Sequence, residues 1–370
     1  MMARGEADSN PDYWNEYTNL QQVKHDLIRC YLGGWFAKLG FWAGRVVYLD
    51  THSGRGKYNS GELGSPLVAL DTLLNHRARH RLLSTSEFVF LFIERDAENL
   101  ERLKRELASR QLPRNVRVDP HCGDAFAVID DIVRNTKALA PAFVFVDPYG
   151  FKIPAATLRA LLRAGRVELF INVIWRELDM AISQARSGLK PGMAATLTEV
   201  FDGEEWRDIA APGLDERADQ AVRLLASKLG AKWHTYIRML GDNDRTRYVL
   251  LHLTNHDEGR DLMKDCMWKV APDGGYYARK SVDPGQLVLI SPTPDPAPLR
   301  QWAVERLRAQ PRRWHELQED LRSELWREPQ LKAVIRELRK EGVISASEYE
   351  GTFSFKADPW LRLGTTRTEE

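Results

Sequence analysis

The sequence has few cysteines, no long apolar run and almost no net charge, and each scarcity narrows its class. Its three cysteines, Cys30, Cys122 and Cys266, stand far apart and form no CxxC pair. A zinc site needs clustered ligands, so we expect buried or half-buried reduced thiols and no metal. No run approaches about 18 apolar residues, and the first residues lack the apolar core of a signal peptide, which predicts a cytoplasmic protein without a membrane segment. A net charge of +1 neither supports nor excludes nucleic acid, because a basic patch can hide within a neutral total.

Helix-like and strand-like patterns alternate along the first half of the chain. Apolar residues recur with helical spacing over 13–40 and give way to a short apolar run, VVYLDTH, at 46–52. The alternation continues, with strands predicted at 46–52, 88–94, 116–122, 143–147 and 167–174 and helices at 66–76, 97–110, 124–139 and 155–165. Strands separated by helices indicate βαβ units, so we expect an α/β fold with a mostly parallel sheet covered on both faces.

The second half begins with a mainly helical stretch at 176–229, whose role the sequence leaves open. Two apolar runs follow, at 233–240 and 247–256, and these are predicted to pair as an antiparallel edge of the sheet. A proline-rich segment at 282–299 has the composition of a linker. With 370 residues, the chain is long enough for one large domain and a smaller one.

The C-terminal part has the layout of a winged helix. Helical patterns at 300–310, 313–326 and 329–342 precede a hairpin at 343–357, with Glu350-Gly351 as its tight turn. The segment RLRAQPRRW gathers Arg306, Arg308, Arg312 and Arg313 beside Trp314, a cluster that suits a phosphate backbone. Acidic residues nearly balance basic ones here, so docking on the other domain or on a protein partner remains the alternative.

Three predicted strand ends carry residues that suit an adenosine-containing cofactor. Gly54 and Gly56 follow the first strand and let the backbone approach a ligand closely, although two glycines can also simply make a turn. Glu94 ends the second strand, where it would accept both ribose hydroxyls or begin a helix as a solvated acid. Asp124 follows the third strand, where it would accept from an adenine amine, with Phe126 beside the ring, or cap a helix. The third glycine of a dinucleotide fingerprint and the Gly-Lys-Ser/Thr of a P-loop are both missing, which favours S-adenosylmethionine (SAM) over NAD or ATP.

The fourth strand delivers FVFVDPYGF to the same edge. The Asp147 carboxylate and the Pro148 carbonyl would accept the two hydrogens of an exocyclic amine on a flipped base. Tyr149 offers a face on which the base can stack, and Gly150 lets the loop pass close by. Transfer of a methyl group to that nitrogen then needs mainly alignment. The alternative is a plain turn after a strand, since all four residues favour turns.

Several of these segments together resemble the three-Cys-motif partner (TcmP) family. They are DTHSGRGKYNSGELGSPLVAL, FVFVDPYGF, ELFINVIWRE and YVLLHLTNHDEGRDLMK, and the resemblance covers about Lys24 to Lys269. DPYG is also similar to the DPFG of tRNA guanine-N2 dimethyltransferases and to the [DNS]PP[YFW] motif of amino-methyltransferases. THSG departs from the FAG-like sequence usual in the family.

The resemblance implies a class I methyltransferase-like (Rossmann) domain at 46–285, with a helical insertion at 176–229. An N-terminal helical segment at 1–45 would precede it, and a winged-helix domain at 296–370 would follow. A separate protein carrying three cysteines would be its partner.

The resemblance also assigns roles to residues. The cofactor would be held by Asp50, Ser53, Gly54 and Gly56 at its methionine end, by Glu94 at its ribose and by Asp124 with Ala125 at its adenine. The acceptor would meet Asp147, Pro148 and Tyr149 as catalytic residues, with Lys57, Tyr58, Gly150, Phe151, Asn172 and Arg176 on the substrate side. For Asn172 a turn cap is the alternative, for Arg176 a surface ion pair, and for Lys57 a solvated loop position.

Three functions follow from these patterns. The first is a SAM-dependent methyltransferase that acts on an exocyclic amino group of a base in DNA or RNA. The second is a catalytically idle module that binds SAM or a nucleotide as the partner of another enzyme, which the altered THSG favours. The third is a winged-helix DNA-binding regulator with a sensor domain. An intact DPYG favours the first, because a pure binding module has no use for a loop that clamps an amine.

Overall fold

The computed structural model describes residues 14–188, 190, 192–241, 245–271, 277–279, 294–349 and 352–364. The chain divides into two compact units, Met1–Cys266 with Tyr276–Leu287, and Met267–Gly275 with Val288–Glu370. Most of the predicted linker at 282–299, and the predicted turn Glu350-Gly351, lie outside the described residues.

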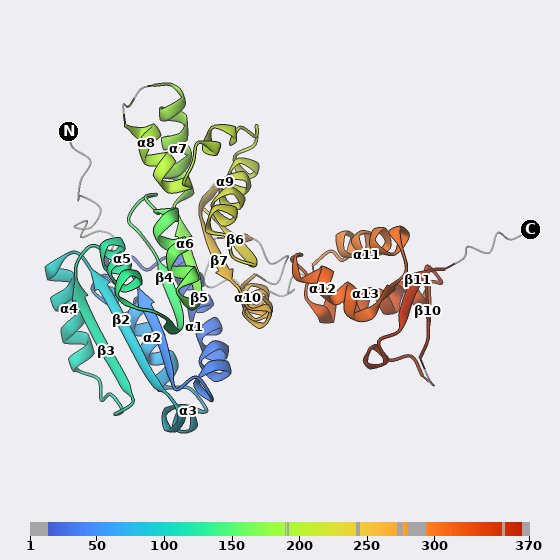
Figure 1. Ribbon diagram of the computed structural model, residues 1–370, viewed down its shortest axis with the longest axis horizontal. Coiled ribbons are helices and arrows are strands. Elements are labelled where there is room, and N and C mark those ends of the chain that lie inside the picture. The colour runs from blue at the N-terminus through green and yellow to red at the C-terminus, as the bar shows by residue number, and fades with distance from the viewer. Residues whose placement is uncertain are drawn as a thin grey trace, which may run out of the picture. The chain divides into compact units, whose positions relative to one another are not determined.

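One mostly parallel sheet forms the centre of the first unit (Figure 1). Its eight described strands lie in the order β3-β2-β1-β4-β5-β7-β6-β8. Their bounds are β1 (Arg45–Asp50), β2 (Glu87–Glu94), β3 (Val116–Cys122), β4 (Leu139–Val146), β5 (Gly165–Val173), β6 (Trp233–Leu240), β7 (Thr246–Thr254) and β8 (Tyr277–Arg279). Strands β1 to β5 run parallel, and β7 runs antiparallel to both β5 and β6. This order, with β7 reversed, is that of the class I methyltransferase-like Rossmann fold, so the predicted fold class is confirmed.

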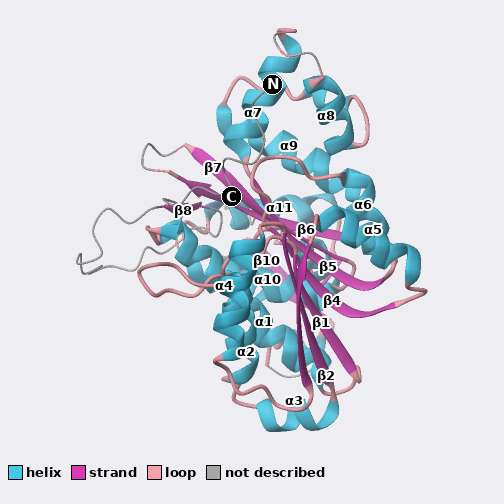
Figure 2. Cartoon of the chain, turned by 90° about the vertical axis from the view of Figure 1, so that its left-hand side faces the viewer, coloured by secondary structure: helices cyan, strands magenta, loops and turns pink. Residues whose placement is uncertain are grey.

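Helices cover both faces of the sheet, as Figure 2 shows for α1 and α2 on one side and α5 and α6 on the other. The helices of this part are α1 (Asn19–Gly40), α2 (Ser65–Leu74), α3 (Arg79–Thr85), α4 (Ala97–Ala108), α5 (Ala125–Asn135), α6 (Ala155–Arg163), α7 (Trp175–Arg186), α8 (Met193–Phe201), the 3₁₀ helix η2 (Glu205–Asp208), α9 (Leu214–Leu229) and α10 (Asp257–Val270). Helix α3 was not predicted, because RHRLLST offers only two adjacent leucines and no helical period.

The two faces have different cores. On the α1 side the core is aromatic: the ring of Tyr31 lies 5.1 Å from that of Phe143, and the ring of Phe36 lies 5.5 Å from that of Phe88. On the other side, aliphatic strand residues such as Val144 pack against α5 to α9. The central strands β4 and β5 are buried over most of their length, and they read as largely apolar runs, whereas the edge strand β3 is more exposed and more polar.

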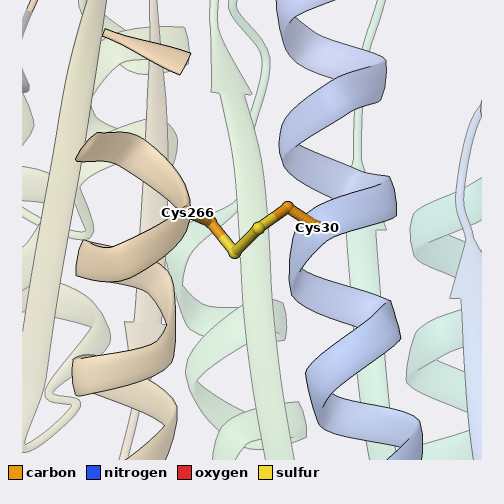
Figure 3. Close-up of a disulfide and its surroundings, with 2 residues drawn as sticks. All are labelled: Cys30 and Cys266. Atoms are coloured by element: carbon orange, nitrogen blue, oxygen red, sulfur yellow. A yellow bond between two sulfur atoms is a disulfide. The ribbon is translucent and has the colours of Figure 1, made fainter. Parts of the chain in front are cut away.

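A disulfide between Cys30 and Cys266 joins α1 to α10 (Figure 3). The two Cα atoms lie 5.7 Å apart although the residues are separated by 236 positions. The expectation of three reduced thiols is therefore wrong for this pair, because the fold brings two distant helices side by side and sequence spacing does not report that. Cys122 is a free thiol but is exposed, at the end of β3, rather than buried.

The second unit has its own small core and a three-stranded antiparallel sheet in the order β10-β11-β9. Its elements are α11 (Ala297–Ala309), β9 (Arg312–Arg313), α12 (Trp314–Arg322), α13 (Glu328–Lys340), β10 (Ile344–Ser347), the 3₁₀ helix η3 (Phe355–Ala357) and β11 (Trp360–Leu363). Three helices followed by paired strands is the predicted order, and the assignment as a winged helix stays a prediction. Within the described part of the chain, no helix is long and apolar enough to cross a membrane.

Candidate active site

The carboxyl ends of β1, β2, β4 and β5 bring four predicted polar residues to one edge of the sheet. They are Asp50, Glu94, Asp147 and Asn172. A cavity of about 370 Å³ opens at this edge, between the N-terminal segment with α1 and the loops that follow β1, β4 and β5. The predicted residues that line it are Ser53, Tyr58, Asp147, Pro148, Tyr149, Gly150, Asn172 and Arg176.

Asp147 holds two partners in this cavity. The Lys24 ammonium lies 2.5 Å from Asp147 Oδ2, and the Asn172 side-chain amide donates to Asp147 Oδ1 at 2.5 Å. Lys24 and Asn172 are both only 4% exposed. Burial alone would raise the pKa of Asp147, but the Lys24 charge and these hydrogen bonds bring it below its ordinary value. The carboxylate is therefore ionised, and it can only accept hydrogen bonds.

The orientation of the Asn172 amide follows from this charge state. An ionised Asp147 has no hydrogen to donate, so the NH₂ group of Asn172 must face it and Oδ1 must point elsewhere. Asn172 Oδ1 is buried and has no hydrogen-bond partner in the structure. The predicted alternative of a turn cap does not describe this side chain, which lies near the end of β5 and lines the cavity.

Lys24 reaches the site because α1 begins just before it and packs on the sheet. Thr18 and Gln21 form a capping box at the start of α1, which fixes where the helix begins. Lys24 then falls on the same helical face as the buried Leu20 and Leu27. Sequence reasoning missed it, although a lysine inside an apolar helical stripe is the signal that would have found it.

An aromatic wall borders the cavity on the same side. The Tyr58 ring lies 5.1 Å from that of Trp14, 5.0 Å from that of Tyr17 and 6.4 Å from that of His25. Burial, and then the Lys24 charge, lower the pKa of His25 to about 3, so its imidazole is neutral at pH 7. The Tyr17 hydroxyl lies 2.9 Å from His25 Nδ1. Of these four residues, only Tyr58 was predicted from the sequence.

The predicted glycine turn after β1 is present. Gly54 and Gly56 adopt φ of +59° and +83°, a backbone region that favours glycine. A Cβ at Gly56 would lie 2.7 Å from a methyl carbon of Leu103, and one at Gly54 would lie 2.5 Å from the ring of Trp14. The Trp14 ring therefore fills the space beside Gly54.

The two acids beside this turn are buried. Asp50 is fully buried and does not line the cavity, and burial, with a smaller contribution from the Asp147 charge, raises its pKa to about 7. Glu94 is 3% exposed. Its two oxygens accept backbone N–H groups from Gly54, at 2.7 Å, and from Asp96, at 2.8 Å. Glu94 thus fastens the loop after β1 to the loop after β2.

Other predicted residues lie away from the cavity. Asp124 is exposed, and its carboxylate accepts hydrogen bonds from the backbone N–H groups of Phe126 and Ala127. It therefore caps α5, which was the predicted alternative to a contact with adenine. Ala125 is buried at the start of α5. Lys57 lines a separate hollow beside α4, and Phe151 packs against the aliphatic core.

The predicted arginine cluster of the second unit lies among carboxylates. Arg313 pairs with Glu348 at 2.6 Å, and Arg312 and Arg306 each lie 3.9 Å from Asp320. Trp314 is 3% exposed, and its ring lies 4.3 Å from that of Phe355. Most of this cluster is thus matched by acids of its own unit, and its aromatic member belongs to the core.

A scan of family models finds no match to this chain, and a search of curated proteins finds no relative. Several solved structures align with this chain at low similarity. Trm1 from Pyrococcus horikoshii in complex with S-adenosyl-L-methionine is 14% identical, with 98% of this chain and 94% of that chain covered and a TM-score of 0.39. Protein LPL1258 from Legionella pneumophila is 16% identical (62% and 85% covered, TM-score 0.36), and the methyltransferase domain of bacterial CtHen1 is 15% identical (64% and 100% covered, TM-score 0.32). With TM-scores this low the fold assignment rests on the strand order itself.

Proposed function

We propose that this protein is a SAM-dependent methyltransferase that acts on an exocyclic amino group of a nucleic-acid base. One observation carries the proposal: the cavity at the carboxyl edge of a methyltransferase-like sheet contains both the loop after β1 and the Asp-Pro-Tyr-Gly loop after β4. Ligands of open α/β sheets bind at this edge. A cofactor and an acceptor bound there would meet between the two loops.

The residues present fit SAM at its methionine and ribose ends. A Cβ at Gly54 or Gly56 would meet Trp14 or Leu103, so this turn suits glycine, and Ser53 lines the cavity beside it. Asp50 would hold the amino group of the methionine end. Each oxygen of Glu94 accepts one backbone N–H, and the same carboxylate would be the acceptor for a ribose hydroxyl. At the adenine end Asp124 would keep its capping role, and Ala125 would supply only backbone contacts.

The acceptor side would hold a flat, amine-bearing group. When bound, SAM supplies a methyl group that its sulfonium already activates. The chain would contribute alignment: Tyr149 offers a face for stacking at the cavity, and the Pro148 carbonyl would accept one amine hydrogen. Arg176 is exposed at the cavity and would meet a phosphate of the same strand.

A protein partner with three cysteines, and DNA or RNA contacts by the second unit, belong to the same proposal. Arg308 is exposed and would be its phosphate contact. The test is transfer of labelled methyl groups from SAM to separate pools of DNA and RNA by the wild-type protein and by Tyr149→Ala. Label in one pool, reduced at least tenfold by Tyr149→Ala, supports the proposal. Absence of label in both pools and unchanged transfer by the variant each contradict it.

A catalytically idle SAM-binding module is the second candidate. Two contacts favour it: the Lys24–Asp147 ion pair within the cavity, and the cover of Trp14 over Gly54. Such a module would bind SAM with the same residues and transfer no methyl group with or without its partner.

A further inference from the structure

The carboxylate of Asp147 is not free to hold a cation. One oxygen faces the Lys24 ammonium and the other accepts from Asn172, each at 2.5 Å. Displacing Lys24 would leave an ammonium group, now 4% exposed, without its counter-charge. Removing one partner of a buried ion pair is strongly unfavourable, because it leaves the other charge uncompensated. A ligand that needs the whole charge of Asp147 therefore binds at a disadvantage.

Among Lys24, Asp147 and Asn172, the hydrogen-bond acceptor without a partner is Asn172 Oδ1. It is buried, lacks a hydrogen-bond partner and belongs to a residue that lines the cavity. Leaving such an atom unpaired is unfavourable, so a ligand that donates an N–H to it is favoured. The atom carries no formal charge, and the amide orientation that exposes it is fixed by Asp147.

The remaining charges of the cavity do not replace the missing negative charge. Its carboxylates are Glu16, Asp147 and Glu177, and its cations are Lys24, Arg176 and Arg247, so the formal charges cancel. Glu16, Glu177 and the two arginines are exposed, whereas Lys24 is buried. Charges exposed to water are screened and are worth little to a buried ligand. An ammonium group that enters the cavity would lose its hydration without a matching anion.

We infer that the cavity takes a neutral amine rather than an ammonium ion, with Asn172 Oδ1 as the atom that accepts its N–H. Lys24 sets this preference because its positive charge neutralises the Asp147 carboxylate. Asp147 then orients the Asn172 amide and does not serve as the counter-charge of the amine. The inference rests on the proposed function for its biological meaning: the exocyclic amines of nucleic-acid bases are neutral at pH 7, whereas the nitrogens of lysine and polyamines are charged. A preference for neutral amines would therefore select bases. The amine preference itself can be measured without any methyl transfer.

Two small aromatic amines of similar size differ in their charge at pH 7 and can serve as probes. Aniline is a neutral aromatic amine at pH 7, and benzylamine is an ammonium ion. Their binding would be followed by NMR titration of the full chain, for the wild type, Lys24→Met, Asn172→Ala and the control Lys38→Met. Lys38 is a half-exposed lysine of the same helix that pairs with Glu258, far from Asp147. Thermal melting of each variant checks that it folds.

We expect the wild type and Lys38→Met to bind aniline at least about tenfold more tightly than benzylammonium. Lys24→Met leaves Asp147 without its counter-charge, so the order should reverse, and Asn172→Ala should weaken aniline binding by about fivefold or more. The inference is overturned if the wild type binds the two probes equally, binds neither, or prefers the ammonium ion. It is also overturned if a folded Lys24→Met keeps the wild-type ratio. The wild-type ratio alone decides the outcome if that variant does not fold, and it does not depend on whether any nucleic acid is methylated.

Discussion

If Asp50 holds the methionine end of SAM, as proposed above, the binding of SAM should depend on pH. The carboxyl is fully buried, and burial raises its pKa to about 7 although Ser65, His52 and Tyr48 donate hydrogen bonds to it. In the free protein it is therefore about half protonated at pH 7. A carboxyl that holds the ammonium of the methionine end must be ionised, because the positive charge lowers its pKa. Binding should then release a proton.

The size of the effect follows from the pKa. With a value of about 7, Asp50 carries about 0.5 proton at pH 7 and about 0.9 at pH 6 before the ligand arrives. The affinity for SAM should fall by about fivefold from pH 7 to pH 6 and by about fifteenfold from pH 7 to pH 5.5. Calorimetric titration in buffers of different ionisation enthalpy measures both the affinity and the protons released.

Asp50→Asn is the matched control, since it keeps the shape and cannot titrate. It should bind SAM more weakly, without the pH dependence and without proton release. Affinity that is flat between pH 5.5 and pH 7 in the wild type, with no proton released, would refute the assignment of Asp50 to the methionine end.

The same pKa has a consequence for stability in the absence of ligand. A carboxyl whose pKa is higher in the folded chain than in the unfolded chain favours folding at low pH and loses that contribution as the pH rises through 7. Relative to Asp50→Asn, the wild type should therefore become less stable between pH 4 and pH 7, by up to about 4 kcal/mol. Urea unfolding of both proteins at several pH values tests the sign, and a wild type that gains stability relative to Asp50→Asn as the pH rises would contradict it.

Three further predictions concern other parts of the first unit. SAM should move Trp14 off Gly54, so the fluorescence change on titration should be smaller in Trp14→Phe than in the wild type, and an equal change in both would contradict this movement. Cys30→Ser should lower the free energy of unfolding in urea by about 2–5 kcal/mol, and a loss below about 1 kcal/mol would mean that the disulfide is absent from the folded protein. Phe143→Ala should lower the free energy of unfolding by about 3–5 kcal/mol in the same assay, because the buried ring packs against α1. The control Trp42→Ala, which removes a side chain that is 55% exposed, should lower it by well under 1 kcal/mol. Similar losses in the two variants would contradict the packing described.

The sheet was predictable because its physics is local. A strand buried on both faces must be apolar throughout, and runs such as FVFLFIE and FVFV can be recognised without knowing what covers them. The residues at the strand ends, including Glu94 and Asp147, followed from the rule that parallel strands present their carboxyl ends at one edge. The separate helix at 79–85 was missed because its short, polar sequence carries no period.

The contacts of the site were not predictable in the same way. Lys24 meets Asp147 across 123 positions of sequence, and Cys30 meets Cys266 across 236, so these pairings depend on how α1 packs against the finished sheet and against α10. Asp124 shows a different limit, because the sequence does not distinguish a carboxylate that caps a helix from one that holds an adenine. In the structure Asp124 makes the cap. The cytoplasmic location of the protein stays a prediction from the sequence.

Calorimetric titration of SAM into the full chain at pH 7 tests the central claim most directly. We expect binding with a dissociation constant on the order of 10 μM in the wild type. Glu94→Ala, at the ribose end, should lose it, and Asn172→Ala, on the acceptor side, should retain it. A wild-type protein that does not bind SAM, or variants whose losses are the other way round, would contradict the division of this cavity between cofactor and acceptor.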